Sequence, residues 1–199
     1  MQTDIEGGVA DFATAVATRI CHDVAGLLSA LTGTLELADE DPEAAVLATE
    51  TAAALVARVQ LLRAAWGGGA GPLDAAAIAA LAQGLPGFER LRLDVAELDG
   101  ELGEVAARLA LCLLLAAVPG VPRGGGIRLA HAPHGGVCLT LLGIGATWPE
   151  ALARCVAAQA NWHDATAPRT LAAPLVCLLA AQAGWRIKLN GPDAIAAPR

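Results

Sequence analysis

The sequence of 199 residues contains few aromatic side chains, 3 %, and no tyrosine. All-β sandwiches rely on aromatic and β-branched residues, so this composition favours helices packed by alanine and leucine. Charged residues are also scarce, at 17 %, whereas hydrophobic residues reach 55 %, which provides a core and argues against intrinsic disorder. The 13 basic residues include a single lysine and form no basic tract, and 20 acidic residues bring the net charge to −7. We therefore expect no nucleic-acid partner.

Long apolar runs and targeting signals are missing as well. The longest apolar run, Leu109–Val118, is too short to cross a bilayer, and the first eleven residues carry three acids in place of a signal peptide. The five cysteines are scattered without a C-x-x-C pair, which indicates buried thiols in a reducing compartment: Cys21, Cys112, Cys138, Cys155 and Cys177. These absences predict a cytoplasmic protein with no membrane partner.

The acidic charge is confined to one end of the chain. Residues 1–66 hold ten acidic and three basic residues, a net charge of −7, whereas residues 67–199 are balanced. A glycine run, Gly67–Gly71 followed by Pro72, separates the two parts. We predict a first domain over 1–66, a glycine-rich linker over 67–72 and a second domain over 73–199.

The first domain has the pattern of two amphipathic helices. Apolar residues recur every three or four positions in each: Val9, Phe12, Val16, Ile20, Val24, Leu27, Leu31 and Leu35, and then Leu47, Leu55, Val59, Leu62 and Trp66. Asp41 followed by Pro42 is a typical start for the second helix. The short turn between the helices predicts an antiparallel hairpin. Its apolar stripes are too broad for two helices to cover, so we expect two hairpins to pair into the four-helix bundle of an obligate homodimer.

The second domain alternates between helical and extended patterns. Helices are predicted over 74–83, 101–118, 149–159 and 169–183, and strands over 91–95, 127–130, 137–142 and 185–189. The strands 127–130 and 137–142 form a hairpin across His134, Gly135 and Gly136. This order predicts an α+β fold in which helices and a sheet form a two-layer sandwich.

His22 is the best candidate for a reactive residue. It lies two positions from Ile20 and from Val24, and two helical steps rotate by about 200°, so His22 faces away from the apolar stripe. The next residue, Asp23, could hold one imidazole nitrogen and leave the other as a nucleophile. An incidental surface histidine is the alternative interpretation of the spacing alone.

The residues around His22 favour a partner surface. Arg19 lies one turn before it and is the only cation expected beside it. Small residues follow on the same face, where long charged side chains would be usual: Gly26, Ser29, Ala30 and Gly33. Because each glycine costs a helix about 1 kcal/mol relative to alanine, a partner that approaches closely would explain this face. We expect its docking to be mainly apolar.

Several segments together resemble a known family. RICHD at 19–23 with LEL at 35–37, LLRAAWG at 61–67, VPRGG at 121–125 and LLAAQAG at 178–184 resemble, in this order, the alphaproteobacterial histidine phosphotransferases of the ChpT type. The resemblance implies a dimerisation hairpin like that of histidine kinases and a second domain like a degenerate kinase ATPase domain. It also implies that His22 accepts phosphate, assisted by Asp23. Such proteins relay phosphate between receiver-domain aspartates, from a hybrid histidine kinase to response regulators, and the receiver supplies Mg²⁺. No cofactor or metal of the protein's own is implied.

A kinase ATPase domain would need nucleotide-binding residues that the second domain lacks. The predicted helix 101–118 contains no asparagine for magnesium, and Leu141 stands where an aspartate would bind adenine before Gly143-Ile144-Gly145. We therefore expect no ATP-dependent kinase activity. A dimeric scaffold or kinase-binding regulator that uses no phosphohistidine remains an alternative to phosphotransfer.

The other motifs predict no site. Gly124-Gly125-Gly126 lacks the lysine and hydroxyl residue of a P-loop and is expected to form a turn. His131 and His134 have no cysteine or carboxylate near them in the sequence, so we expect surface histidines and no metal centre. The segment NWHD at 161–164 has no matching nucleophile motif and is expected to be a loop.

Overall fold

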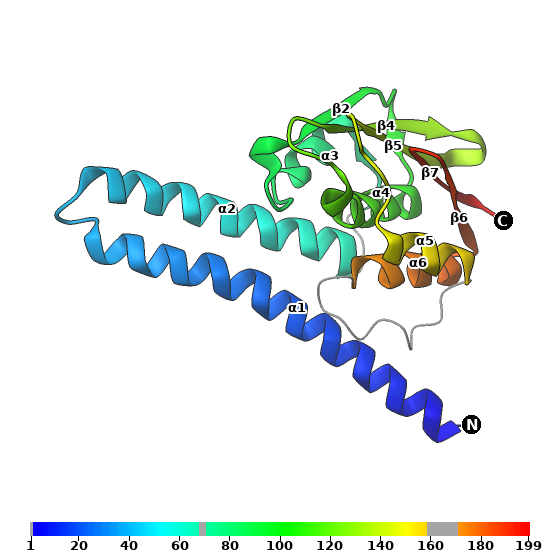
Figure 1. The fold of residues 1–199 in the computed structure, drawn as a ribbon, viewed down its shortest axis with the longest axis horizontal. Coiled ribbons are helices and arrows are strands. Elements are labelled where there is room, and N and C mark those ends of the chain that lie inside the picture. The colour runs from blue at the N-terminus through cyan, green and yellow to red at the C-terminus, as the bar shows by residue number, and fades with distance from the viewer. Residues whose placement is uncertain (1, 68–70, 159–170) are drawn as a thin grey trace.

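The computed structural model describes residues 2–67, 71–158 and 171–199, with side chains from residue 10 onward. It shows a long helical hairpin that projects from an α/β body (Figure 1). Helix α1 (Gln2–Leu37) and helix α2 (Pro42–Trp66) form the hairpin. The predicted cap is confirmed, because the Asp41 carboxylate accepts a hydrogen bond of 2.9 Å from the backbone N–H of Glu43, with Pro42 in the first turn.

The body contains one five-stranded sheet in the order β2-β4-β5-β7-β6. Its strands are β2 (Arg92–Glu97), β4 (Gly126–Ala132), β5 (Gly136–Leu142), β6 (Trp185–Asn190) and β7 (Asp193–Pro198). The predicted hairpin of β4 and β5 is confirmed, with Ala132 opposite Gly136 and His134 in the left-handed region at φ 60°. Strand β7 pairs with β5 and with β6 in antiparallel fashion, whereas β2 runs parallel to β4.

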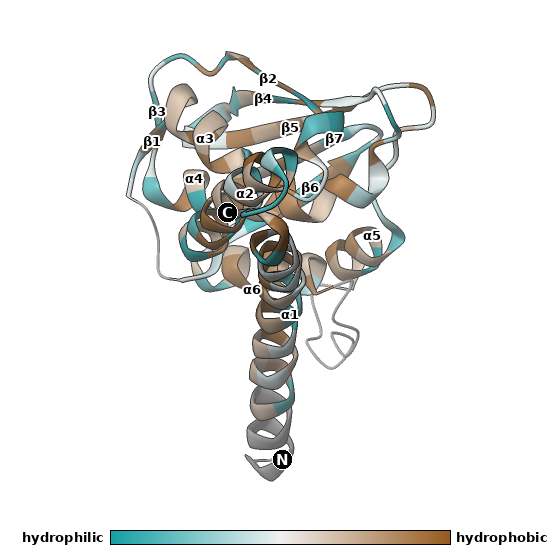
Figure 2. Cartoon of the chain, turned by 90° about the vertical axis from the view of Figure 1, so that its left-hand side faces the viewer, coloured by the Kyte–Doolittle hydropathy of each residue, from teal (hydrophilic) through white to brown (hydrophobic). Residues whose placement is uncertain are grey.

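Helices cover one face of this sheet and complete a two-layer sandwich (Figure 1). They are α3 (Ala75–Ala82), α4 (Glu104–Ala117), α5 (Glu150–Ala157) and α6 (Ala172–Gln182). Helix α4 is buried along nearly its whole length, which explains why leucine, alanine and Cys112 fill most of its positions. Figure 2 shows these hydrophobic residues in brown where the helices meet the strands. The predicted α+β class is therefore confirmed.

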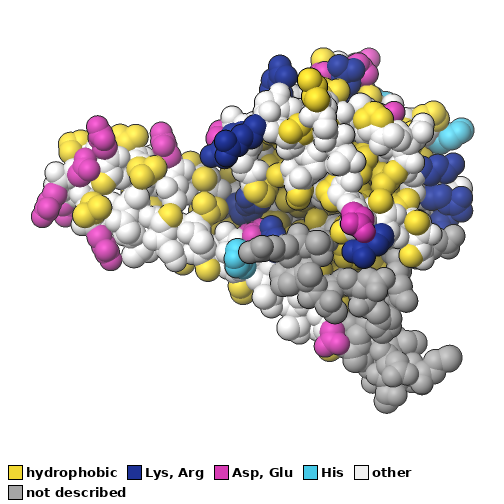
Figure 3. All heavy atoms as spheres, in the orientation of Figure 1, with side chains coloured by type: hydrophobic (Ala, Val, Ile, Leu, Met, Phe, Trp, Pro, Cys, Tyr) yellow, Lys and Arg dark blue, Asp and Glu magenta, His cyan; other side chains and the backbone are white. Residues whose placement is uncertain are grey.

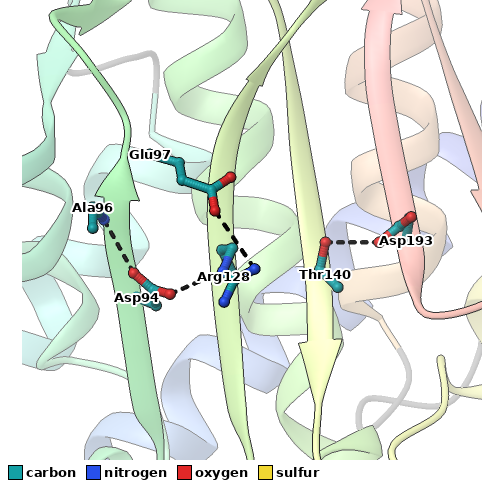
Figure 4. A network of polar contacts seen from close by, with 6 residues as sticks. All are labelled: Asp94, Ala96, Glu97, Arg128, Thr140 and Asp193. Atoms are coloured by element: carbon teal, nitrogen blue, oxygen red, sulfur yellow. Dashed lines mark hydrogen bonds and ion pairs between the residues drawn. The ribbon is translucent and has the colours of Figure 1, made fainter.

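The opposite face of the sheet is polar. Arg128 on β4 donates through Nε to Asp94 of β2 over 2.9 Å and lies 3.5 Å through Nη1 from Glu97. The Thr140 hydroxyl on β5 donates over 2.7 Å to Asp193 of β7 (Figure 4). The hydrogen bond from Arg128 lowers the pKa of Asp94 below its ordinary value. These solvated pairs explain why no second helical layer is needed on this face.

Three expectations need correction, two for the body and one for the hairpin. Residues 101–102 do not begin a helix; they form strand β3 (Glu101–Leu102), which pairs with β1 (Leu73–Asp74), and α4 begins only after Gly103. Strand β7 was not predicted, because its alternating alanines carry little extended propensity. Cys21 is exposed rather than buried, although Cys112 and Cys177 are buried as expected.

The hairpin and the body share one hydrophobic core. Leu61, Ala64 and Ala65 at the end of α2 belong to the same buried cluster as α4 and the sheet. Arg108 on α4 donates to the backbone carbonyls of Ala65 and Trp66 over 3.1 and 3.3 Å. These bonds satisfy carbonyls that a helix C-terminus otherwise leaves without partners. The end of α2 is therefore held firmly against the body.

A second close contact lies further along α2. A Cβ atom at Gly84, just after α3, would lie only 2.3 Å from the carbonyl oxygen of Ala57 and 2.9 Å from the Cβ of Leu61. Only glycine allows the backbone of the body to approach α2 so closely. Gly84 and Arg108 thus fix how the hairpin is placed on the body.

Candidate functional site

His22 lies on α1, beside Asp23, which lines a cleft between the hairpin and the body. Its side chain is 80 % exposed, as predicted from its position opposite the apolar stripe. Its Nδ1 lies 3.6 Å from Oδ1 of Asp23, too far for a hydrogen bond but close enough for an electrostatic contact. With Nδ1 on the side of the carboxylate, Nε2 is the nitrogen available to react.

Asp23 is held much more firmly than His22. Its side chain is 12 % exposed, and Oδ2 accepts a hydrogen bond of 3.1 Å from Nε of Arg19 one turn earlier on the same helix. Arg19, His22 and Asp23 are therefore brought together, in the order guanidinium, carboxylate and imidazole. This arrangement fixes a negative charge beside an exposed imidazole, where it can stabilise an imidazolium.

A second cation at the site, which the sequence analysis did not single out, is Arg58 on α2, which lies near Asp23. Burial lowers the pKa of the Arg58 guanidinium, the nearby carboxylate of Asp23 opposes this shift, and Arg19 adds to it. Nε and Nη1 of Arg58 are buried without a hydrogen-bond partner among the described residues. The signal in the sequence is a charged residue within the apolar pattern of the second helix.

The predicted partner face lies on the solvent side of α1. Gly26, Ser29, Ala30 and Gly33 follow His22 at steps of four, seven, eight and eleven residues, and all of them are exposed. A Cβ atom at Gly26 or at Gly33 would meet nothing within 4 Å, so the chain itself does not require glycine there. The face is bare and open to a partner.

Of the motifs that were expected to be turns or surface residues, those within the described residues are so. Gly125 donates to the Pro122 carbonyl over 2.9 Å in a turn, and Gly143 and Gly145 both have positive φ around an exposed Ile144. Leu141, in the position of an adenine-binding aspartate, is buried in β5. His131 and His134 are exposed. The segment 161–164 lies outside the described residues.

Metal-ligand geometry is not found in the part of the chain that the structure describes. No group of three histidine, cysteine, aspartate or glutamate side chains there could hold a metal ion.

These features define a class of protein: a helical hairpin with an exposed histidine, packed on an α/β body. A solved structure described as a bacterial phosphotransferase has this fold, with a TM-score of 0.70 and 23 % identity over 94 % of this chain and 95 % of that one. A histidine kinase domain from the Erythrobacter litoralis EL346 blue-light activated histidine kinase also matches, with 15 % identity over 86 % and 93 % of the two chains and a TM-score of 0.41. No curated protein matches the sequence.

The family follows from the body. The family described as histidine phosphotransferase C-terminal domain matches residues 75–195, which is more than half of the chain. The protein therefore belongs to the histidine phosphotransferase family, as the resemblance in its sequence predicted. The matched residues begin after the hairpin, so the assignment of His22 depends on the geometry of α1.

Proposed function

We propose that His22 carries a phosphoryl group between the receiver-domain aspartates of a hybrid histidine kinase and of response regulators. The observation that carries this proposal is the exposed imidazole on α1 with the carboxylate of Asp23 fixed beside its Nδ1. Membership of the histidine phosphotransferase family supports it. Receivers of this kind act in the cytoplasm, and we place the protein there.

The chemistry follows from the two ring nitrogens. Nε2 of the neutral imidazole attacks the phosphorus of an aspartyl phosphate, the N–P bond forms, and the P–O bond to the receiver carboxylate breaks. The proton stays on Nδ1, so the ring becomes a cation that Asp23 stabilises. Transfer to the next receiver reverses these steps. The receiver brings the Mg²⁺ that neutralises the phosphoryl oxygens.

We propose that receivers dock on the bare face of α1. Gly26, Ala30 and Gly33 would allow a helix of the receiver to lie close to the bundle. A long side chain on this face should block the approach, so Ala30→Arg should slow transfer strongly. Glu50→Arg, an exposed position on α2, is the matched control and should transfer normally. Equal effects of the two substitutions would argue against this face.

We further propose that two copies pair through their hairpins. Among the described residues, seven of the eight large hydrophobic side chains that remain exposed lie on the hairpin: Leu28, Leu35, Leu37, Val46, Leu47, Val56 and Val59. So much apolar surface is unusual on a soluble monomer, and a second hairpin would cover it in a four-helix bundle. Helix α2 is also long and apolar enough to cross a membrane. Glu50 and Arg58 would then lie within the bilayer, which is costly, so pairing is the better explanation.

The body is proposed to bind no ATP. Helix α4 contains no asparagine, and buried Leu141 cannot accept a hydrogen bond from adenine. A calorimetric titration with Mg-ATP should therefore show no binding, and incubation with Mg-ATP alone should not phosphorylate the protein. A dissociation constant in the micromolar range would contradict this part of the proposal.

The test of phosphotransfer uses a receiver domain loaded with radiolabelled phosphate in the presence of Mg²⁺. The chain should acquire a label that acid removes and alkali does not, as expected of a phosphoramidate. His22→Ala should abolish labelling while circular dichroism and melting temperature stay unchanged, because the exposed side chain contributes nothing to the core. Undiminished labelling of that variant would refute the assignment. Binding of the receiver without any labelling of the parent protein would favour the alternative function, a dimeric scaffold that uses no phosphohistidine.

A further inference from the structure

Strand β6 lies at one end of the sheet and has an unpaired edge. It pairs with β7 on one side, and no strand lies on its other side in the part of the chain that the structure describes. An edge strand presents a row of backbone N–H and C=O groups to which another extended segment can bind. Strand β6 is six residues long, so an added segment could form hydrogen bonds along its whole length.

The side chains of β6 divide into a basic face and an apolar face. Arg186 and Lys188 are exposed, whereas Ile187 between them is buried in the core beneath the sheet. The residues opposite the two cations on β7 are Ala197 and Ile195, so neither cation faces a carboxylate across the strand pair. The side chains of Arg186 and Lys188 form no hydrogen bond or ion pair with any described residue. This basic face is therefore unoccupied by acidic groups of the chain itself.

The basic face of β6 differs from most other cations of the body. Arg90, Arg128 and Arg154 each form an ion pair with an aspartate or a glutamate, over 3.3, 2.9 and 3.9 Å. Arg199 donates through Nε to the Trp185 carbonyl over 3.4 Å and adds a third cation beside the start of β6. Figure 3 shows dark-blue basic side chains at the right-hand margin of the body, where Figure 1 places β6. In a chain with a net charge of −7, this local positive charge favours an acidic partner.

A cavity of about 170 Å³ adjoins the start of β6 on the helix side of the sheet. Its wall consists of apolar side chains of α5 and α6, among them Val156 and Ala181, and of Trp185 and Ile187 on β6. Exposed Arg186 lines it as well, so the cavity opens beside the basic face of the strand. Because successive side chains of a strand point to opposite faces, an added strand would direct every second side chain toward this cavity.

We propose that the edge of β6 binds an acidic extended peptide of a partner protein as an added strand. The side chains of this peptide alternate: carboxylates lie beside Arg186 and Lys188, and apolar side chains face the helices, with one of them in the cavity. Backbone hydrogen bonds to β6 supply affinity, while the two cations and the cavity select the sequence. All residues that line the cavity belong to the body, so the proposal does not depend on phosphotransfer through His22.

A second copy of the chain fits this edge poorly. Two β6 strands side by side would bring the cations of both copies together, and like charges on neighbouring strands are destabilising. Charged side chains on an edge strand can also serve only to prevent aggregation. An edge with that role alone would bind no peptide, so peptide binding separates the two roles.

Fluorescence anisotropy with labelled peptides of six residues, the length of β6, tests the proposal on the full chain. The first peptide alternates glutamate with valine. The second has lysine in place of each glutamate, and the third is the first peptide with a methyl group on every backbone nitrogen. The first should bind, and the other two should bind at least about tenfold more weakly, because they lose the opposite charge and the backbone donors respectively. Absence of binding by the first peptide, or equal binding of all three, would overturn the proposal.

Charge reversal on β6 locates the binding surface. Arg186→Glu combined with Lys188→Glu should raise the Kd of the glutamate peptide at least about tenfold and lower that of the lysine peptide. Arg90→Glu combined with Arg123→Glu is the matched control, because it makes the same change in charge at exposed positions that line a separate cleft near β2, at the opposite end of the sheet. Unchanged binding by the β6 variant, or an equal loss in the control, would place the peptide elsewhere and refute the proposal.

A second pair of substitutions tests the cavity. Ala181 is exposed and lines the cavity, so Ala181→Phe places a ring at its entrance without disturbing the core. This variant should bind the glutamate peptide at least about threefold more weakly, with an unchanged melting temperature. Ala153→Phe, at an exposed position of α5 that does not line the cavity, is the control and should bind like the parent. Equal affinities of the two variants would contradict a role for the cavity in the proposed site.

Discussion

The contact between Gly84 and α2 allows a sharp test of how the hairpin is attached. In Gly84→Ala the new methyl group would lie 2.3 Å from the Ala57 carbonyl oxygen and 2.7 Å from its carbonyl carbon. Favourable contacts between such atoms need about 3.5 Å or more. Both obstructing atoms belong to the backbone of α2, so relief requires the helix or the following turn to move.

The size of the effect can be worked from this geometry. Overpacking of a well-packed contact costs about 1–3 kcal/mol. For a chain of this length, each kcal/mol lowers the melting temperature by about 2–4 °C, so we expect a decrease of about 2–12 °C. Gly84 does not have the positive φ that would itself penalise alanine, so the loss reports the steric contact alone.

Thermal unfolding followed by circular dichroism is the assay, with Gly33→Ala as the matched control. Gly33 lies within α1, where a Cβ atom meets nothing within 4 Å, so alanine there should raise stability by up to about 1 kcal/mol. The two substitutions are chemically identical and should shift the melting temperature in opposite directions. A Gly84→Ala protein that melts at or above the parental temperature would refute the close approach.

Three further predictions concern the hairpin and the thiols. Arg58→Met removes two buried nitrogen atoms, Nε and Nη1, that have no hydrogen-bond partner among the described residues, and it should leave the urea midpoint unchanged or higher. A loss of more than about 2 kcal/mol in the free energy of unfolding would mean that the guanidinium is satisfied after all. Gly26→Ala should raise the melting temperature yet slow phosphotransfer, because its methyl group fits the free chain but meets a docked receiver; equal or faster transfer would contradict a close-approach surface. Iodoacetamide should modify exposed Cys21 first and buried Cys112 and Cys177 last, because burial raises the pKa of the latter two thiols to about 12. Mass spectrometry of the native protein after increasing reaction times would show this order.

Local patterns in the sequence were sufficient for the helices and for the candidate residue. The hairpin followed from apolar spacing together with Asp41 and Pro42, and the exposure of His22 followed from its angle to Ile20 and Val24. Helical periodicity and capping act over a few residues, so neighbouring positions contain the information. The strand pair β4 and β5 was predictable for the same reason, because a short turn connects its strands.

Tertiary structure alone decided what distant segments do together. Strand β7 is placed between β5 and β6, and β2 runs parallel to β4. The sequences of these strands have little β propensity of their own, and hydrogen bonding to neighbouring strands of the sheet holds them extended. Arg58 approaches Asp23 only because two antiparallel helices pack, and Gly84 approaches Ala57 only because the body rests on α2. A cleft between the hairpin and the body brings Arg19 and Asp23 together with Val118 and Pro119, which lie 95–100 positions later in the chain, and such proline and valine side chains are common in any loop. Their meaning depends on long-range packing, which no short stretch of sequence specifies.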